Sequence, residues 1–188
     1  MKVVILCGGL GTRLAEETSV RPKPMVNIGD HPILWHIMKS YEKYGFNDFV
    51  LALGYKGDYI KDYFINYHLK GSNLTVNTSS GETIIENNPK ENWNVSLINT
   101  GSETLTGGRL LRLKDVLNET FMVTYGDGVS DVDISKLLEF HKNSGKVATV
   151  TSVRPPARFG GMKIVNGIVK EFKELASLTV IEDNFVLF

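Results

Sequence analysis

Three short apolar runs, each followed within two residues by a glycine, constrain the fold of this chain more than any other feature. Residues 3–6, 49–53 and 121–125 are these runs, and Gly8, Gly54 and Gly126 follow them. A continuous apolar run of this length is typical of a strand that is buried on both faces of a sheet. Such strands need helices on both sides, which predicts a layered α/β domain.

Helical patterns lie between these runs. Residues 32–44 carry apolar side chains at helical spacing up to Gly45, and this pattern predicts an amphipathic helix that ends at the glycine. Further segments predict the remaining elements: helices over 58–67, 108–117 and 134–141, β-like pieces over 74–98, a strand over 148–153, and a hairpin around Asn166-Gly167. The alternation predicts a Rossmann-like mixed, mainly parallel sheet with helices on both faces.

Ligands of such sheets bind beyond the carboxyl ends of the strands. The segments that follow the three runs are the Gly8-Gly9 loop, Gly54-Tyr55 and residues 126–128. We therefore expect these three strand ends to meet at one crevice.

The totals narrow the class of protein. The 188 residues suit one domain, 1–188, and Lys plus Arg equals Asp plus Glu at 21 each. The chain therefore has no net charge that would attract nucleic acid or an anionic membrane to its surface as a whole. Cys7 is the only cysteine, and neither a signal peptide nor a membrane-spanning run is recognisable. We expect a cytoplasmic protein that binds no nucleic acid and no membrane.

The first glycine loop has the composition of a phosphate-binding loop. Gly8, Gly9 and Gly11 allow backbone N–H groups to approach a phosphate, and Arg13 adds a charged donor. No Gly-Lys-Ser/Thr follows, so the loop is not a P-loop, and a tight turn after a first strand is the alternative. Lys23 lies between two prolines, and this rigid setting for an ammonium group favours the phosphate site.

These motifs together resemble those of the sugar-1-phosphate nucleotidyltransferases. The loop and the Arg-Pro-Lys-Pro-Met stretch at 21–25 are similar to the signature of the whole family. The stretches at 106–109 (Thr-Gly-Gly-Arg) and 125–131 (Tyr-Gly-Asp-Gly-Val-Ser-Asp) resemble the branch of glucose-1-phosphate cytidylyltransferases. The resemblance extends to about residue 172 and implies the nucleotidyltransferase, glycosyltransferase-A-like version of the fold.

The resemblance also implies a reaction and its residues. CTP and α-D-glucose 1-phosphate would give CDP-glucose and pyrophosphate, in nucleotide-sugar biosynthesis for surface polysaccharide such as the lipopolysaccharide O-antigen, by a homo-oligomer. Mg²⁺ would be held by Asp127, and Arg13, Lys23 and Asp127 would be the catalytic residues. The implied nucleotide-binding residues are Leu6, Gly8, Gly9, Gly11, Thr12, Arg13, Lys23, Thr104, Arg109 and Gly126.

The chain departs from the family after about residue 172. Leu175 and Ala176 stand where the family has a lysine that holds the sugar phosphate and a proline, and a second metal-binding aspartate has no counterpart. We expect a truncated or divergent end, with CTP binding and cytidylyl transfer that is very weak or absent. Two alternatives stay open: a nucleotide-binding or regulatory relative with impaired catalysis, and a nucleotidyltransferase that uses another NTP or sugar 1-phosphate.

Overall fold

The computed structural model describes residues 1–9, 20–86, 91–153, 161–173 and 186–187. The chain forms two compact units, Met1–Asp131 and Val132–Phe188. Within the described residues, no helix is both long and apolar enough to cross a membrane. That the whole chain acts as one domain stays a prediction.

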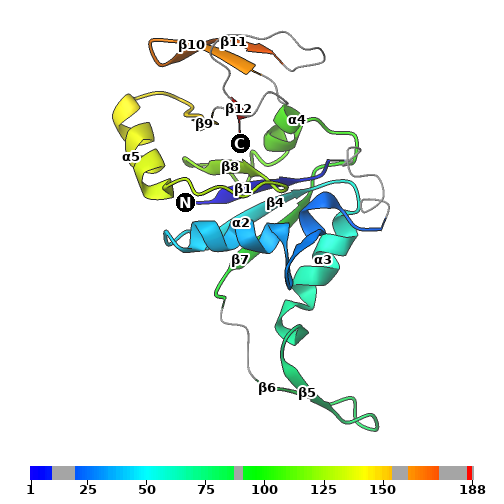
Figure 1. The fold of residues 1–188 in the computed structure, drawn as a ribbon. Coiled ribbons are helices and arrows are strands. Elements are labelled where there is room, and N and C mark those ends of the chain that lie inside the picture. Colours follow the sequence, from blue (N-terminus) through cyan, green and yellow to red (C-terminus); the bar gives the residue numbers. More distant parts are fainter. Residues whose placement is uncertain (10–19, 87–90, 154–160, 174–185, 188) are drawn as a thin grey trace. The chain divides into compact units, whose positions relative to one another are not determined.

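A parallel sheet forms the centre of the first unit (Figure 1). It contains β1 (Val3–Cys7), β4 (Asp48–Leu53), β7 (Asn94–Asn99) and β8 (Met122–Tyr125), in the order β7-β4-β1-β8. All three strand pairs are parallel, and all of β1 is buried. The predicted parallel sheet is therefore confirmed, and its described strands include none that is antiparallel.

Helices cover both faces of this sheet (Figure 1). The helices α2 (Ile33–Glu42) and α3 (Gly57–Ile65) lie on one side, and α4 (Thr106–Leu111) lies on the other. The layered α/β architecture predicted from the apolar runs is confirmed.

Apolar side chains of alternate strand residues fill the space between the layers. On the α4 side, strand residues and Leu113 form one buried cluster, with Val4, Leu6, Val50 and Ala52. Full burial of a Val or Leu side chain is worth about 1.5–3 kcal/mol relative to exposure. The strand ends near the functional site are therefore held by a rigid core.

Aromatic rings fill the space on the α2 side. Phe49 of β4 contacts Trp93, and Trp93 in turn contacts Trp35 of α2, with ring centroids 5.9 and 6.4 Å apart. Both pairs are edge-to-face, a favourable geometry for aromatic rings. These contacts attach α2 to the sheet.

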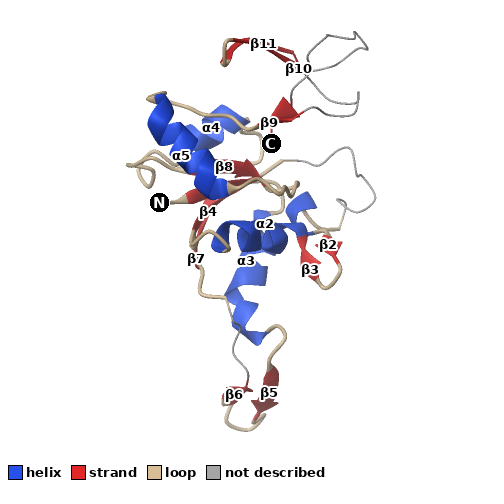
Figure 2. Ribbon diagram, turned by 60° about the vertical axis from the view of Figure 1, so that its left-hand side comes forward, coloured by secondary structure: helices blue, strands red, loops and turns tan. Residues whose placement is uncertain are grey.

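Short elements complete the first unit. They are η2 (Lys23–Met25), the pair β2 (Asn27–Ile28) and β3 (His31–Pro32), η3 (Tyr67–Leu69), and the hairpin of β5 (Asn73–Val76) and β6 (Thr83–Glu86). Figure 2 shows that neither hairpin belongs to the central sheet.

The described residues of the second unit form one helix and two antiparallel strand pairs. The helix is α5 (Ile134–Ser144), and Asp133 caps it by accepting a hydrogen bond from the Lys136 N–H at 3.1 Å. The pairs are β9 (Ser152–Val153) with β12 (Val186–Leu187), and β10 (Gly161–Val165) with β11 (Ile168–Lys173).

The turn between β10 and β11 confirms the predicted hairpin. Asn166 and Gly167 have φ angles of 53° and 73°. Two positive φ angles in a two-residue turn suit the right-handed twist of the strands, and Asn-Gly adopts them easily.

Three predicted elements differ from the structure. The helix expected over 108–117 is α4 followed by turns at 112–116, and the strand expected over 148–153 is only β9. The helix expected over 58–67 is divided into α3 and η3.

Candidate functional site

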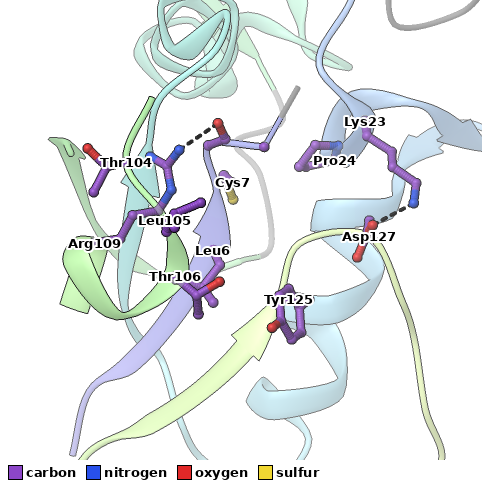
Figure 3. A pocket seen from close by; sticks show the side chains of 12 residues that line it. Leu6, Cys7, Lys23, Pro24, Thr104, Leu105, Thr106, Arg109, Tyr125 and Asp127 are labelled. Atoms are coloured by element: carbon purple, nitrogen blue, oxygen red, sulfur yellow. Dashed lines mark hydrogen bonds and ion pairs between the residues drawn. The ribbon is translucent and has the colours of Figure 1, made fainter. Parts of the chain in front are cut away.

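A cavity of about 360 Å³ lies at the carboxyl ends of β1 and β8 and at the start of α4 (Figure 3). The expected meeting of the glycine loop with the end of β8 is therefore confirmed. The lining residues are Leu6, Cys7, Gly8, Gly9, Lys23, Pro24, Thr104, Leu105, Thr106, Arg109, Tyr125 and Asp127.

Lys23 reaches the cavity from a rigid backbone. It begins η2, where the Met25 N–H donates to the Pro22 carbonyl at 2.8 Å, and Pro24 and Met25 are buried. The flanking prolines restrict the backbone. The lysine side chain can therefore move while its Cα is held in place.

Asp127 forms an ion pair with Lys23. The Nζ atom lies 2.5 Å from Oδ2 of Asp127, and the two side chains are 29% and 38% exposed. A pair this open to solvent contributes at most about 1 kcal/mol to stability. The pair is thus weak enough for a ligand to rearrange.

Close packing at Gly126 brings Asp127 to this position. The Gly126 N–H donates to the Leu6 carbonyl at 3.0 Å. A Cβ atom at residue 126 would lie 3.0 Å from each of three atoms: Cys7 Sγ, the Leu6 carbonyl oxygen and Pro24 Cγ. Glycine therefore lets the end of β8 meet β1 and η2 without a clash.

Asp127 has the chemistry of a magnesium ligand, although it is a single carboxylate. Among the residues that the structure describes, no three His, Cys, Asp or Glu side chains form a group that could hold a metal ion. Mg²⁺ in phosphate-transfer sites commonly uses one or two carboxylates together with phosphate oxygens and waters. Asp127 fits that arrangement if a phosphate ligand supplies the other oxygens.

Arg109 of α4 is almost fully buried, with 5% of its surface exposed. Its Nη atoms donate to five oxygen atoms at 2.7–3.2 Å, which we call the Arg109 cluster: the carbonyls of Gly8, Leu53, Gly101 and Ser102, and the hydroxyl of Thr100. Burial, and secondly the charge of Arg112, lower the pKa of Arg109. The guanidinium still carries its charge at neutral pH.

Glycines make room for this guanidinium. A Cβ atom on Gly8 would lie 2.1 Å from Arg109 Nη1, and one on Gly54 would lie 2.6 Å from the same atom. Gly8 follows β1 and Gly54 follows β4. Gly54 does not line the cavity itself. It contributes to the site indirectly, by leaving space for the Arg109 guanidinium.

Cys7 is a buried thiol. It is 1% exposed. Burial, with a smaller effect of the Asp127 charge, raises the pKa of the Cys7 thiol well above its usual range. A thiol without appreciable thiolate is a poor nucleophile.

Comparison with known proteins identifies the family. The sequence pattern described as nucleotidyl transferase matches residues 2–177, most of the chain. The chain belongs to the nucleotidyl transferase family.

Two relatives of this nucleotidyl transferase are especially informative. The glucose-1-phosphate cytidylyltransferase of Salmonella typhi is 51% identical over 176 residues, which cover 93% of this chain and 68% of that protein. The probable glucose-1-phosphate cytidylyltransferase of Bacillus subtilis (strain 168) is 47% identical over 178 residues, 94% of this chain and 70% of that protein.

Solved structures share the fold of this nucleotidyl transferase. HddC from Yersinia pseudotuberculosis complexed with GMP-PN has a TM-score of 0.70 and 26% identity, covering 99% of this chain and 72% of that one. A putative glucose-1-phosphate thymidylyltransferase from Bacillus anthracis has a TM-score of 0.72 and 21% identity, covering 100% and 68%. The second likeness shows the fold alone.

The cavity of the nucleotidyl transferase gathers most of the residues expected at its site. Leu6, Gly8, Gly9, Lys23, Thr104, Arg109 and Asp127 line it, and Gly126 packs behind it. Gly11, Thr12 and Arg13 lie outside the described residues, as do Leu175 and Ala176. Their roles stay predictions.

Five further lining residues were not expected from the sequence. Three of them adjoin expected site residues in the chain, and that adjacency is the signal that could have found them: Cys7, Pro24 and Tyr125. Leu105 and Thr106 continue the stretch from Thr104 into the first turn of α4. The carbonyl partners of Arg109 carry no signal in the sequence, because every residue has a carbonyl group.

Proposed function

We propose that this chain transfers the cytidylyl group of CTP to glucose 1-phosphate, forming CDP-glucose and pyrophosphate. The observation that carries the proposal is the 51% identity to a glucose-1-phosphate cytidylyltransferase over 93% of the chain. The cavity adds an independent argument, since it combines a glycine loop, an ammonium group and a carboxylate at strand ends. Such a set suits a triphosphate and its metal ion.

In the proposed reaction, a phosphate oxygen of the sugar phosphate forms a bond to the α-phosphorus of CTP. The bond from that phosphorus to the bridging oxygen breaks, and pyrophosphate leaves with the electron pair. Mg²⁺, when bound, neutralises charge on the phosphates. Lys23 would turn from Asp127 to the α-phosphate, and Asp127 would hold the ion. The loop residues Gly8, Gly9, Gly11 and Thr12 would wrap the nucleotide, and Arg13 would hold the β- and γ-phosphates.

Thr104 and Arg109 complete the proposed nucleotide site, and the cavity supports this by including both. We place the reaction in the cytoplasm, with a homo-oligomer as the working form and a role in nucleotide-sugar supply for surface polysaccharide. A single buried thiol agrees with a reducing compartment.

The test is a pyrophosphate-release assay with each of CTP, UTP, GTP and dTTP, with glucose 1-phosphate and other sugar 1-phosphates as acceptors. We expect turnover to be highest with CTP and glucose 1-phosphate. CTP with Mg²⁺ should also raise the melting temperature most, because ligand at 100 times its Kd adds about 2.7 kcal/mol of stability. A preference for GTP, the nucleotide class bound in the HddC structure, would overturn the CTP assignment.

A further inference from the structure

The peptide bond between Gly8 and Gly9 departs from the strand ladder at the end of β1. The Leu6 carbonyl accepts a hydrogen bond from Gly126, on the β8 side of β1. Carbonyls two residues apart lie on the same side of an extended strand, so a continuing strand would direct the Gly8 carbonyl to β8 as well. Instead it accepts from the Tyr55 N–H at 3.2 Å and from Arg109 Nη2 at 2.8 Å, on the β4 side.

The orientation of the Gly8–Gly9 peptide bond determines where the Gly9 N–H points. In a planar trans peptide, the C=O of one residue and the N–H of the next point in opposite directions. With the Gly8 carbonyl held on the β4 side, the Gly9 N–H points away from β4. Lys23 and Asp127 lie on that opposite side of β1 (Figure 3). The Gly9 amide therefore faces the same part of the cavity as the charged pair.

We propose that Arg109 is a positioning residue that aims the Gly9 N–H at a polyphosphate ligand. Its guanidinium bonds the Gly8 carbonyl with one Nη atom, while the other bonds the carbonyl at the end of β4 and two oxygens that follow β7. The group thus ties the glycine loop to two neighbouring strand ends. A lysine cannot make this planar fork of donors.

The charge of Arg109 adds to this effect. All five oxygens of the Arg109 cluster are neutral carbonyls or a hydroxyl, so they solvate the cation without cancelling its charge. A buried positive charge beside an amide donor favours an anion. The ligand class that fits is a di- or triphosphate, and in taking this ligand the inference rests on the proposed function.

The experiment follows the Gly9 amide by NMR in the full chain labelled with ¹⁵N-glycine. Gly9→Ala assigns the resonance, because a Cβ atom there meets nothing within 4 Å. Inorganic pyrophosphate with Mg²⁺ is the probe. Arg109→Lys keeps the charge and removes the fork. Arg112→Lys is the matched control, since Arg112 is exposed, lies three residues further on and donates to the Thr100 carbonyl.

We expect Arg109→Lys to displace the Gly9 resonance before any ligand is added and to weaken pyrophosphate binding by about tenfold or more, the value of a hydrogen bond to a charged group. Arg112→Lys should resemble the unmodified chain in both respects. Weaker binding with an unmoved Gly9 resonance would show direct contact by Arg109 and overturn the inference. A displaced resonance with unchanged affinity would overturn it as well.

Gly8→Ala provides a second route if Arg109→Lys does not fold. The new Cβ atom would lie 2.1 Å from Arg109 Nη1, too close for both to stay, and would displace the guanidinium while the arginine remains. The same loss of pyrophosphate affinity is expected, and normal affinity would contradict the proposal. Binding of pyrophosphate without preference for CTP would refute the proposed function alone, and absence of pyrophosphate binding by the unmodified chain would refute both.

Discussion

Lys23 has two competing partners: the Asp127 carboxylate and the proposed α-phosphate. Charge on that phosphate grows in the transition state, so the lysine should stabilise the transition state more than bound CTP. We therefore predict that Lys23→Ala lowers kcat by about 10²-fold or more, with a smaller change in KM. Steady-state kinetics measure both. The exposed Lys136 serves as the control, and a changed KM with an unchanged kcat would disprove the role.

Lys23 and Arg109 also show which site residues a sequence can reveal. Two prolines mark Lys23 as a rigid cation, and two glycines mark Asp127 as a strand-end carboxylate. Arg109 could be singled out only by resemblance, as a nucleotide-binding residue. Its hydrogen bonds to backbone oxygens depend on how three strand ends meet, and no side-chain pattern encodes that arrangement.

The start of α4 offers a test at the scale of one element. Gly107 and Gly108 are adjacent in the helix, yet a Cβ atom at 107 meets nothing within 4 Å, whereas one at 108 lies 2.8 Å from Thr104 Cγ2. Glycine in a helix costs about 0.5–1 kcal/mol relative to alanine. We predict that Gly107→Ala stabilises the chain by about that amount.

Gly108→Ala is the matched comparison. The alanine raises the helix propensity by the same amount, but its Cβ atom clashes with Thr104 and this offsets the gain. The Gly108→Ala chain should therefore be less stable than the Gly107→Ala chain. Urea denaturation measures the difference. Equal stabilisation by the two changes would mean that Thr104 moves aside without cost.

The sequence predicts elements with a clear hydrophobic pattern well and elements with a weak pattern poorly. The strands β1 and β4 and the helix α2 follow from uninterrupted apolar runs and helical spacing. The helix α4 was expected to begin at 108, because two glycines weaken the helix pattern there, and to continue to 117, because apolar residues that pack on the sheet from turns have similar spacing.

Cys7 reports on the first unit as a whole. It ends the central strand, is 1% exposed although it lies at the cavity wall, and is the only cysteine. A thiol reagent therefore reaches its buried sulfur only when the packing around the end of β1 opens. We predict labelling more than about a thousandfold slower in the native chain than in urea. Rates under the two conditions provide the measurement, and fast native labelling would show that β1 opens locally.

At the scale of the whole molecule, the order of the strands in the sheet can be predicted only in part from a single sequence. The converging ends of β1 and β8 follow from the parallel arrangement, which the apolar runs predict. The position of β7 does not follow, because its inner residues are only half-buried, its end residues are exposed, and its segment resembles the neighbouring hairpin strands in sequence. Tertiary contact with β4 decides its place.

The glycines around Arg109 make substitutions in this protein depend on one another. At Gly8, all three of the nearest atoms to an added Cβ belong to Arg109, whereas at Gly54 two of them are backbone oxygens of Gly8 and Gly101. A shorter side chain at residue 109 would therefore remove the clash made by a larger residue at position 8. It would not remove the clash at position 54, where backbone oxygens remain. Residues 8 and 109 form an epistatic pair, so the cost of changing both is less than the sum of the two separate costs.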